Sequence, residues 1–137
     1  MKLYLMLMLY LVSVPVFSST NDDRFNERYG LWFSFESTCS PCLHFAPILY
    51  EFASEHNLNL MAISKDSRPL RTWPGNWHID KNATLYRLGI EEQGTPTLVL
   101  SDSQTGETTI VSLGFTTKEQ LTQRLYQLTG INLGEKE

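Results

Sequence analysis

Both cysteines of this 137-residue chain lie in one tetrad, Cys39-Ser40-Pro41-Cys42, where one kind of secondary structure gives way to another. The residues before it, 30–35, form a nearly continuous apolar run with the length of a buried strand. The residues after it place Phe45, Leu49 and Phe52 at helical spacing. The tetrad therefore predicts a strand that turns directly into a helix, with both thiols at the turn.

The first 18 residues have the pattern of a secretory signal peptide. Lys2 is followed by an uncharged apolar stretch and then by small polar residues, with cleavage expected near Ser18. A membrane-spanning helix requires about 20 apolar residues, and the apolar stretch here is shorter, so cleavage is favoured. A leader retained as a membrane anchor is the alternative. We expect a leader over residues 1–18 and a single domain over residues 19–137. Export would place that domain in an oxidising compartment, where disulfides persist.

Composition narrows the class of protein further. The formal net charge is −4 and the chain has no block of basic residues, so nucleic acid is not an expected partner. Hydrophobic residues make up 42% of the chain, which argues against disorder. Because no dimerisation segment is visible, we expect a monomer.

The remaining pattern predicts an α/β fold with a mixed four-stranded sheet flanked by helices. The parallel part comes from a strand, helix, strand crossover, and the antiparallel part from a later hairpin. Ser37 and Thr38 are suitable N-cap residues for the first long helix, and Thr116-x-x-Glu119 is a candidate capping box for the last one. Gly130 is the expected stop of that helix. The expected elements are a lead-in or short helix at 21–29, strands at 30–35 and 58–64, an irregular segment at 65–82, a short helix at 82–88, strands at 97–100 and 108–113, and the final helix.

A Cys-x-x-Cys pair at a helix start suits thiol–disulfide exchange. The helix N-terminus favours the thiolate of Cys39 as nucleophile, and Cys42, one turn later, would resolve the mixed disulfide. Half of a zinc site is an alternative, with His44, His56 or His78 as further ligands, but a second close-spaced ligand pair is missing. A purely structural disulfide is another alternative, although a bond between Cys39 and Cys42 closes so small a loop that it would add little stability. We expect neither a metal nor a cofactor.

Three motifs together resemble the thioredoxin fold: Cys39-x-x-Cys42 after a hydrophobic strand, Pro47 in the helix, and Gly94-Thr95-Pro96-Thr97 before another strand. The resemblance implies that Pro96 follows a cis peptide bond and faces the cysteines. It also implies that Thr95 offers its backbone to an extended substrate segment. Thr95 and Pro96 are therefore the expected substrate-binding residues, beside Cys39 and Cys42 as the catalytic pair.

Short phrases elsewhere are similar to the TraF and TrbB proteins of F-type conjugative transfer systems, which are thioredoxin-like and take part in pilus assembly. These phrases are Arg28-Tyr29-Gly30-Leu31, Tyr86-Arg87-Leu88-Gly89-Ile90 and Leu113-Gly114-Phe115. Thioredoxins carry a Trp and a buried Asp where this chain has Thr38 and Phe33. Another group would then manage the proton of Cys42, with Glu36 or a water as candidates.

The resemblance implies a periplasmic thiol:disulfide oxidoreductase, an isomerase or an oxidase, that supports assembly of conjugative pilus or secretion components. Its partners would be exported clients that contain cysteines and a membrane or periplasmic redox partner. One alternative is a non-catalytic thioredoxin-fold scaffold of the conjugation machinery. Another is a reductase for cytochrome c maturation, which a reduction potential would distinguish.

Overall fold

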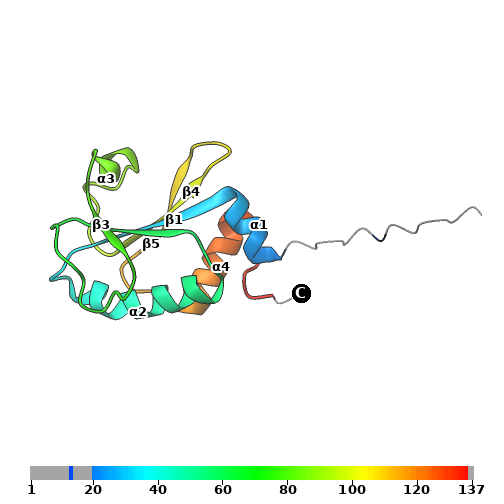
Figure 1. Ribbon diagram of the computed structural model, residues 1–137, viewed down its shortest axis with the longest axis horizontal. Coiled ribbons are helices and arrows are strands. Elements are labelled where there is room, and N and C mark those ends of the chain that lie inside the picture. The colour runs from blue at the N-terminus through cyan, green and yellow to red at the C-terminus, as the bar shows by residue number, and fades with distance from the viewer. Residues whose placement is uncertain (1–12, 14–19, 136–137) are drawn as a thin grey trace, which may run out of the picture.

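The computed structural model describes residue 13 and residues 20–135. Its five strands form one sheet in the order β3-β2-β1-β4-β5 (Figure 1). The elements are α1 (Asn21–Arg28), β1 (Tyr29–Phe35), α2 (Ser40–Glu55), β2 (Leu60–Ser64), β3 (Trp77–Ile79), α3 (Thr84–Arg87), β4 (Thr97–Asp102), β5 (Thr108–Leu113) and α4 (Lys118–Thr129).

The central strand, β1, makes the sheet mixed. It runs parallel to β2 and antiparallel to β4, so that Phe33 lies between Ala62 and Leu98. β4 and β5 form the predicted antiparallel hairpin. The α/β class and the mixed sheet are therefore confirmed.

The sheet has one strand more than the sequence pattern predicted. β3 pairs in parallel with β2 at the edge of the sheet, with His78 opposite Ile63. It lies within the segment expected to be irregular, and its three residues are too few to show an alternating pattern. Pro74 and Gly75, shortly before β3, are typical of a turn and therefore favour the prediction of a loop over that of a strand.

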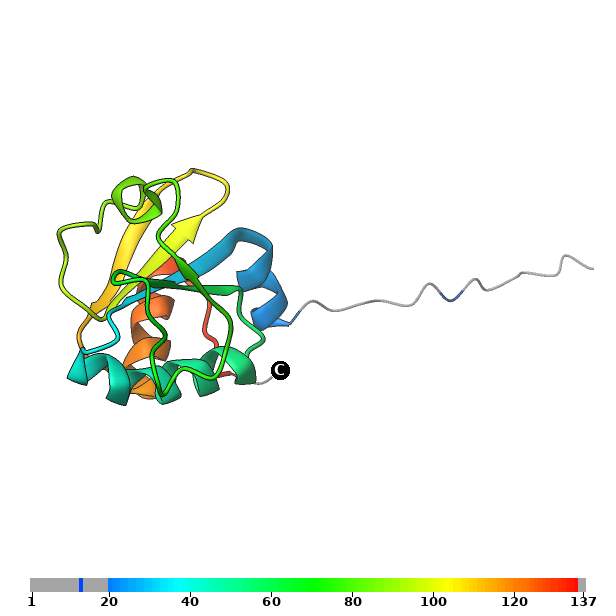
Figure 2. The same cartoon turned by 60° about the vertical axis from the view of Figure 1, so that its left-hand side comes forward.

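Helices cover the two faces of the sheet unequally. Helices α2 and α4 pack together below the sheet in Figure 1, and the turned view of Figure 2 shows the same arrangement. The main core lies between them and the sheet and includes the fully buried Phe33, Phe45 and Leu125. The opposite face carries a smaller core, in which Leu85 of α3 packs with Val99.

The last helix begins one residue later than the predicted capping box. Thr117 is the N-cap, and it exchanges hydrogen bonds with Gln120 at the third helical position. Thr116 is buried, and its hydroxyl donates to the same glutamine side chain. The box at Thr116 and Glu119 is therefore wrong by one position. The stop at Gly130 is confirmed, and this residue has the left-handed φ of 73° that favours glycine.

The predicted leader, residues 1–18, lies outside the described residues except for Ser13. Between residues 20 and 135, no helix combines the length and the apolar character that crossing a membrane requires.

Candidate active site

The cysteine pair lies where β1 ends and α2 begins. Cys39 is itself the N-cap of α2, and its Sγ accepts a hydrogen bond from the backbone N–H of Cys42 at 3.2 Å. The expectation that Ser37 or Thr38 would cap this helix is wrong. Pro41 lies in the first turn, where its missing N–H has no intrahelical partner to lose.

The two cysteines are joined as a disulfide, with their Cα atoms 5.2 Å apart. They differ in accessibility, because Cys42 is fully buried in the main core while Cys39 is half-buried at its edge. A thiol that approaches from solvent can therefore reach the sulfur of Cys39 but not that of Cys42.

Thr95 and Pro96 lie directly opposite this sulfur. The peptide bond between them is cis, and the Thr95 carbonyl oxygen is 3.3 Å from Sγ of Cys39. Pro96 is buried, and its carbonyl accepts a hydrogen bond from Gly114 N–H at 2.9 Å. The fold thus brings together all four residues that the sequence singled out, from segments more than 50 positions apart.

Glu36 also lies at this turn. Its backbone carbonyl accepts a hydrogen bond from the Cys39 N–H at 3.2 Å, and its carboxylate accepts one from the Thr95 hydroxyl at 3.4 Å. Glu36 is half-buried. Its carboxylate lies beside Thr95, the residue whose carbonyl faces Cys39. His44, by contrast, is exposed on α2.

No acidic group occupies the position of the buried aspartate of thioredoxins. Phe33 is fully buried there, and its ring centroid lies 5.3 Å from that of Trp73 and 5.9 Å from that of Phe45. Trp73 is therefore a core residue. Proton transfer to Cys42 cannot use a carboxyl at this position.

Exposed apolar side chains adjoin the loop of Pro96. Leu113 is 59% exposed and Phe115 is 52% exposed, and they flank Gly114, which donates the hydrogen bond to Pro96. The ring of Phe115 also packs on Phe45 of α2, at 6.4 Å between centroids. An exposed apolar surface at Leu113 and Phe115 was not predicted from the sequence. The sequence pattern that could have indicated this surface is a pair of apolar residues on either side of a glycine at the end of a predicted strand.

The turn before Cys39 is bound to a carboxylate that the sequence analysis did not single out. Asp66 accepts hydrogen bonds from the hydroxyl and the backbone N–H of Ser37. The Ser37 hydroxyl, together with a bond from Ser64, lowers the pKa of Asp66 to about 2. Among residues 20–135, no three His, Cys, Asp or Glu side chains gather in a group that could hold a metal ion.

Solved structures of thiol:disulfide oxidoreductases share this fold. A secreted Mycobacterium tuberculosis disulfide oxidoreductase homologous to E. coli DsbE is 14% identical, with a TM-score of 0.56 over 76% of this chain and 84% of that chain. StoA from Bacillus subtilis is 19% identical, with a TM-score of 0.56 over 72% of this chain and 82% of that chain. The DsbF protein of M. tuberculosis is 16% identical, with a TM-score of 0.55 over 78% of this chain and 85% of that chain. These similarities show a thioredoxin-like fold.

Sequence comparison identifies the family. No curated protein matches the chain. The family model of TraF, described as the F plasmid transfer operon protein, matches residues 23–126. This match spans most of the chain and includes the cysteine pair, Thr95 and Pro96, so the chain belongs to the TraF family.

Proposed function

We propose that this protein is a periplasmic thiol:disulfide oxidoreductase, an isomerase or an oxidase, that supports assembly of conjugative pilus or secretion components. One observation carries the proposal: the half-buried Cys39 is bonded to the buried Cys42, and its sulfur lies 3.3 Å from the Thr95 carbonyl oxygen. A purely structural disulfide would need neither the partial exposure of Cys39 nor the Thr95 carbonyl beside its sulfur.

The exchange proceeds through Cys39. During oxidation of a client, a client thiolate attacks Sγ of Cys39, the bond to Cys42 breaks, and Cys42 leaves as a thiolate that takes up a proton. A second client thiolate then attacks the client sulfur of the mixed disulfide and releases Cys39 as a thiolate. The client loses two electrons and the cysteine pair gains them. During isomerisation, the Cys39 thiolate attacks a client disulfide and releases one client thiolate, and a different client thiolate then attacks the client sulfur of the mixed disulfide and releases Cys39, with no net transfer of electrons. Resolution by Cys42 instead would leave the client reduced and the cysteine pair oxidised.

The client segment binds beside Thr95 and Pro96. The Thr95 backbone aligns an extended chain across Cys39, and Leu113 and Phe115 offer apolar surface next to it. Burial of such side chains contributes about 25 cal/mol per Å² of apolar area, so a flanking apolar residue in the client would increase its affinity.

The compartment and the pathway are supported by the family and the leader pattern. The family model describes a protein of the F plasmid transfer operon, and one structural neighbour is described as secreted. The clients would be exported proteins with cysteines, and a membrane or periplasmic partner would restore the redox state of the pair. The protein would act as a monomer.

Trapping of the mixed disulfide tests the chemistry. A Cys42→Ala variant keeps Cys39 but cannot resolve, so it should retain a client as a covalent adduct that dithiothreitol releases. The matched Cys39→Ala variant keeps only the buried thiol and should retain none. Equal adducts from both variants, or none from either, would contradict the proposed reaction.

Complementation tests the link to conjugation and the scaffold alternative together. In a donor strain that lacks this protein, the wild type should restore pilus assembly and a double Cys39→Ser, Cys42→Ser variant should not. Full restoration by the double variant would favour a scaffold. The reduction potential of the cysteine pair then separates an oxidant from a reductase of the cytochrome c type, since reductases lie near the thioredoxin value of about −270 mV.

A further inference from the structure

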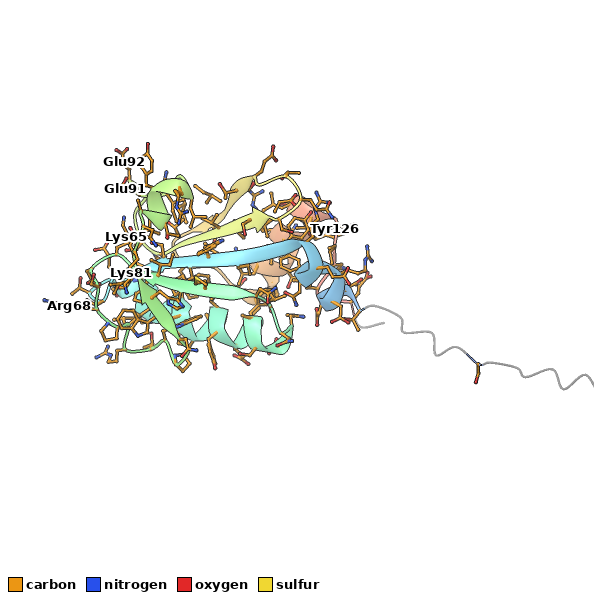
Figure 3. The ribbon with its side chains drawn as sticks, turned by 45° about the horizontal axis from the view of Figure 1, so that its top comes forward. Lys65, Arg68, Lys81, Glu91, Glu92 and Tyr126 are labelled. Carbon is orange, nitrogen blue, oxygen red and sulfur yellow. A yellow bond between two sulfur atoms is a disulfide. The ribbon has the colours of Figure 1, made fainter. Side chains whose placement is uncertain are left out.

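The residue that follows β2, Lys65, joins the end of the sheet to the loop that faces Cys39. Its Nζ donates hydrogen bonds to the backbone carbonyls of Glu91 at 3.1 Å and Gln93 at 2.8 Å. Figure 3 labels Lys65 at the end of the sheet where Glu91 and Glu92 also lie. Lys65 is half-buried, and an ammonium group that donates to two carbonyls of one loop restrains that loop, because ionic hydrogen bonds are stronger than neutral ones.

The carbonyls that Lys65 binds belong to the approach to Thr95 and Pro96. Residues 91–93 lead directly into Gly94, Thr95 and the cis peptide bond. After that bond, the chain is fixed by β4 and by the hydrogen bond from Gly114 to Pro96. Before it, the side chain of Lys65 supplies two hydrogen bonds from a different element. The position of the Thr95 carbonyl thus depends on restraints at both ends of the loop.

Lys65 can restrain the loop because its own backbone is fixed. Its N–H donates to the carbonyl of Phe35, the last residue of β1, at 2.8 Å. The next residue, Asp66, is bound to Ser37 in the turn before Cys39, and to the fully buried Ser64 at 2.9 Å. One strand end therefore contacts both the cysteine turn and the loop opposite it.

We propose that Lys65 is a positioning residue for client binding, which holds the loop of Thr95 and Pro96 at the distance from Cys39 that an extended peptide requires. This inference rests on the proposed exchange activity. Lys65 touches neither sulfur, so its effect is confined to substrates that use the loop. A small dithiol, which reacts with Cys39 without lying along Thr95, is insensitive to it.

A comparison of two reductants tests the role of Lys65. The oxidised full-length chain is mixed with a neutral peptide that carries two cysteines, and separately with dithiothreitol, and the second-order rate of loss of the Cys39–Cys42 disulfide is measured for each. For Lys65→Met, the ratio of the peptide rate to the dithiothreitol rate should fall at least about tenfold, since a misplacement of about 1 Å can cost as much as about a hundredfold in rate. Lys65→Arg keeps the charge and the donors and should recover most of the ratio.

The matched control is Lys81→Met, which removes the same charge. Lys81 is exposed and follows β3, so the parallel pairing of β2 and β3 places it at the same end of the sheet. It should leave the ratio within about twofold of the wild type, because it has no contact with the loop among the described hydrogen bonds. If Lys65→Met does not fold, as judged by thermal unfolding, Lys65→Gln replaces it, and its single amide should give an intermediate ratio.

The outcomes separate the two proposals. A wild type that reacts with dithiothreitol but not with any cysteine peptide contradicts the proposed function itself. A wild type that oxidises the peptide, with an unchanged ratio in Lys65→Met, contradicts only the role of Lys65. An equal fall in both rates also contradicts it, because a general loss of structure would slow both reductants.

Discussion

Phe33 occupies the position at which thioredoxins bury an aspartate. The variant Phe33→Asp therefore tests whether the core of this protein tolerates a buried carboxyl group. The phenyl ring is fully buried and packs against the rings of Phe35, Phe45 and Trp73. The core cluster around it consists of hydrophobic residues. A carboxylate at this position would have no cationic neighbour within that cluster.

The cost has two parts. Truncation of a buried Phe costs about 3–5 kcal/mol through lost contacts and the cavity left behind. Burial also raises the pKa of the new carboxyl well above its unfolded value of about 3.9, so at pH 7 the folded state must bind a proton, at up to about 4 kcal/mol. The sum, about 7–9 kcal/mol, is comparable to the whole stability of a typical domain.

The second part depends on pH in a definite direction. Because the folded state binds this proton more tightly than the unfolded chain, stability should fall as pH rises from about 4 to 7. Asn is nearly the same size as Asp but cannot ionise, so the Phe33→Asn variant suffers only the loss of stability that comes from truncating the ring. Every other titrating group is common to the two variants, and their difference isolates the new carboxyl.

Urea unfolding followed by tryptophan fluorescence measures this difference, since Trp73 lies 5.3 Å from the altered ring. The Asp and Asn variants should have similar midpoints near pH 4, while at pH 7 the Asp variant should unfold at a much lower urea concentration or be unfolded without urea. Equal midpoints at both pH values would show that the site provides a partner for the carboxylate, and the expectation that burial raises the pKa of the new carboxyl would be wrong.

Two further predictions concern stability. Thr117→Ala removes the cap of α4 and should lower the free energy of unfolding by about 1 kcal/mol, as measured by urea unfolding. Glu119→Ala should change this free energy by less than about 0.5 kcal/mol. A larger effect of Glu119→Ala than of Thr117→Ala would support the capping box predicted from the sequence. The pKa of Asp66, held by Ser37, and that of Asp102, held by Arg28, are lowered from 3.8 to about 2, so their stabilisation is present above pH 4 and lost as pH falls toward 2. Urea midpoints between pH 2 and 5 should therefore rise less steeply with pH in Asp66→Asn than in the wild type, and parallel curves would contradict this assignment.

The sequence was most informative where short-range patterns control the structure. The apolar run before the cysteines, the helical spacing after them and Gly130 identified β1, α2 and the end of α4 to within a few residues. These features depend on neighbours within one or two turns, and each has its own residue signature.

Features that depend on distant contacts were not predicted. β3 is a strand only because β2 offers it a free edge. The cap at Cys39 is local, since its sulfur accepts the N–H of Cys42 three residues later, but Ser37 and Thr38 are the more usual cap residue types and therefore misled the prediction. The cluster of Cys39, Thr95 and Pro96 was foreseen through family resemblance rather than from spacing. Lys65 and Asp66 gave no signal, because an adjacent lysine and aspartate after a strand are common surface residues.

The pairing of β1 with β4 sets when the exchange site can exist during biosynthesis. Phe33 meets Leu98 across this pair. Cys39 meets Thr95, which lies 56 residues further along the chain. Contacts of such sequence separation form late, because a long loop must close first. A chain in which β4 has not yet formed therefore contains both thiols without the loop of Thr95 and Pro96 beside them. In the folding protein, the surroundings of Cys39 are completed after the strand and the helix that carry the two cysteines.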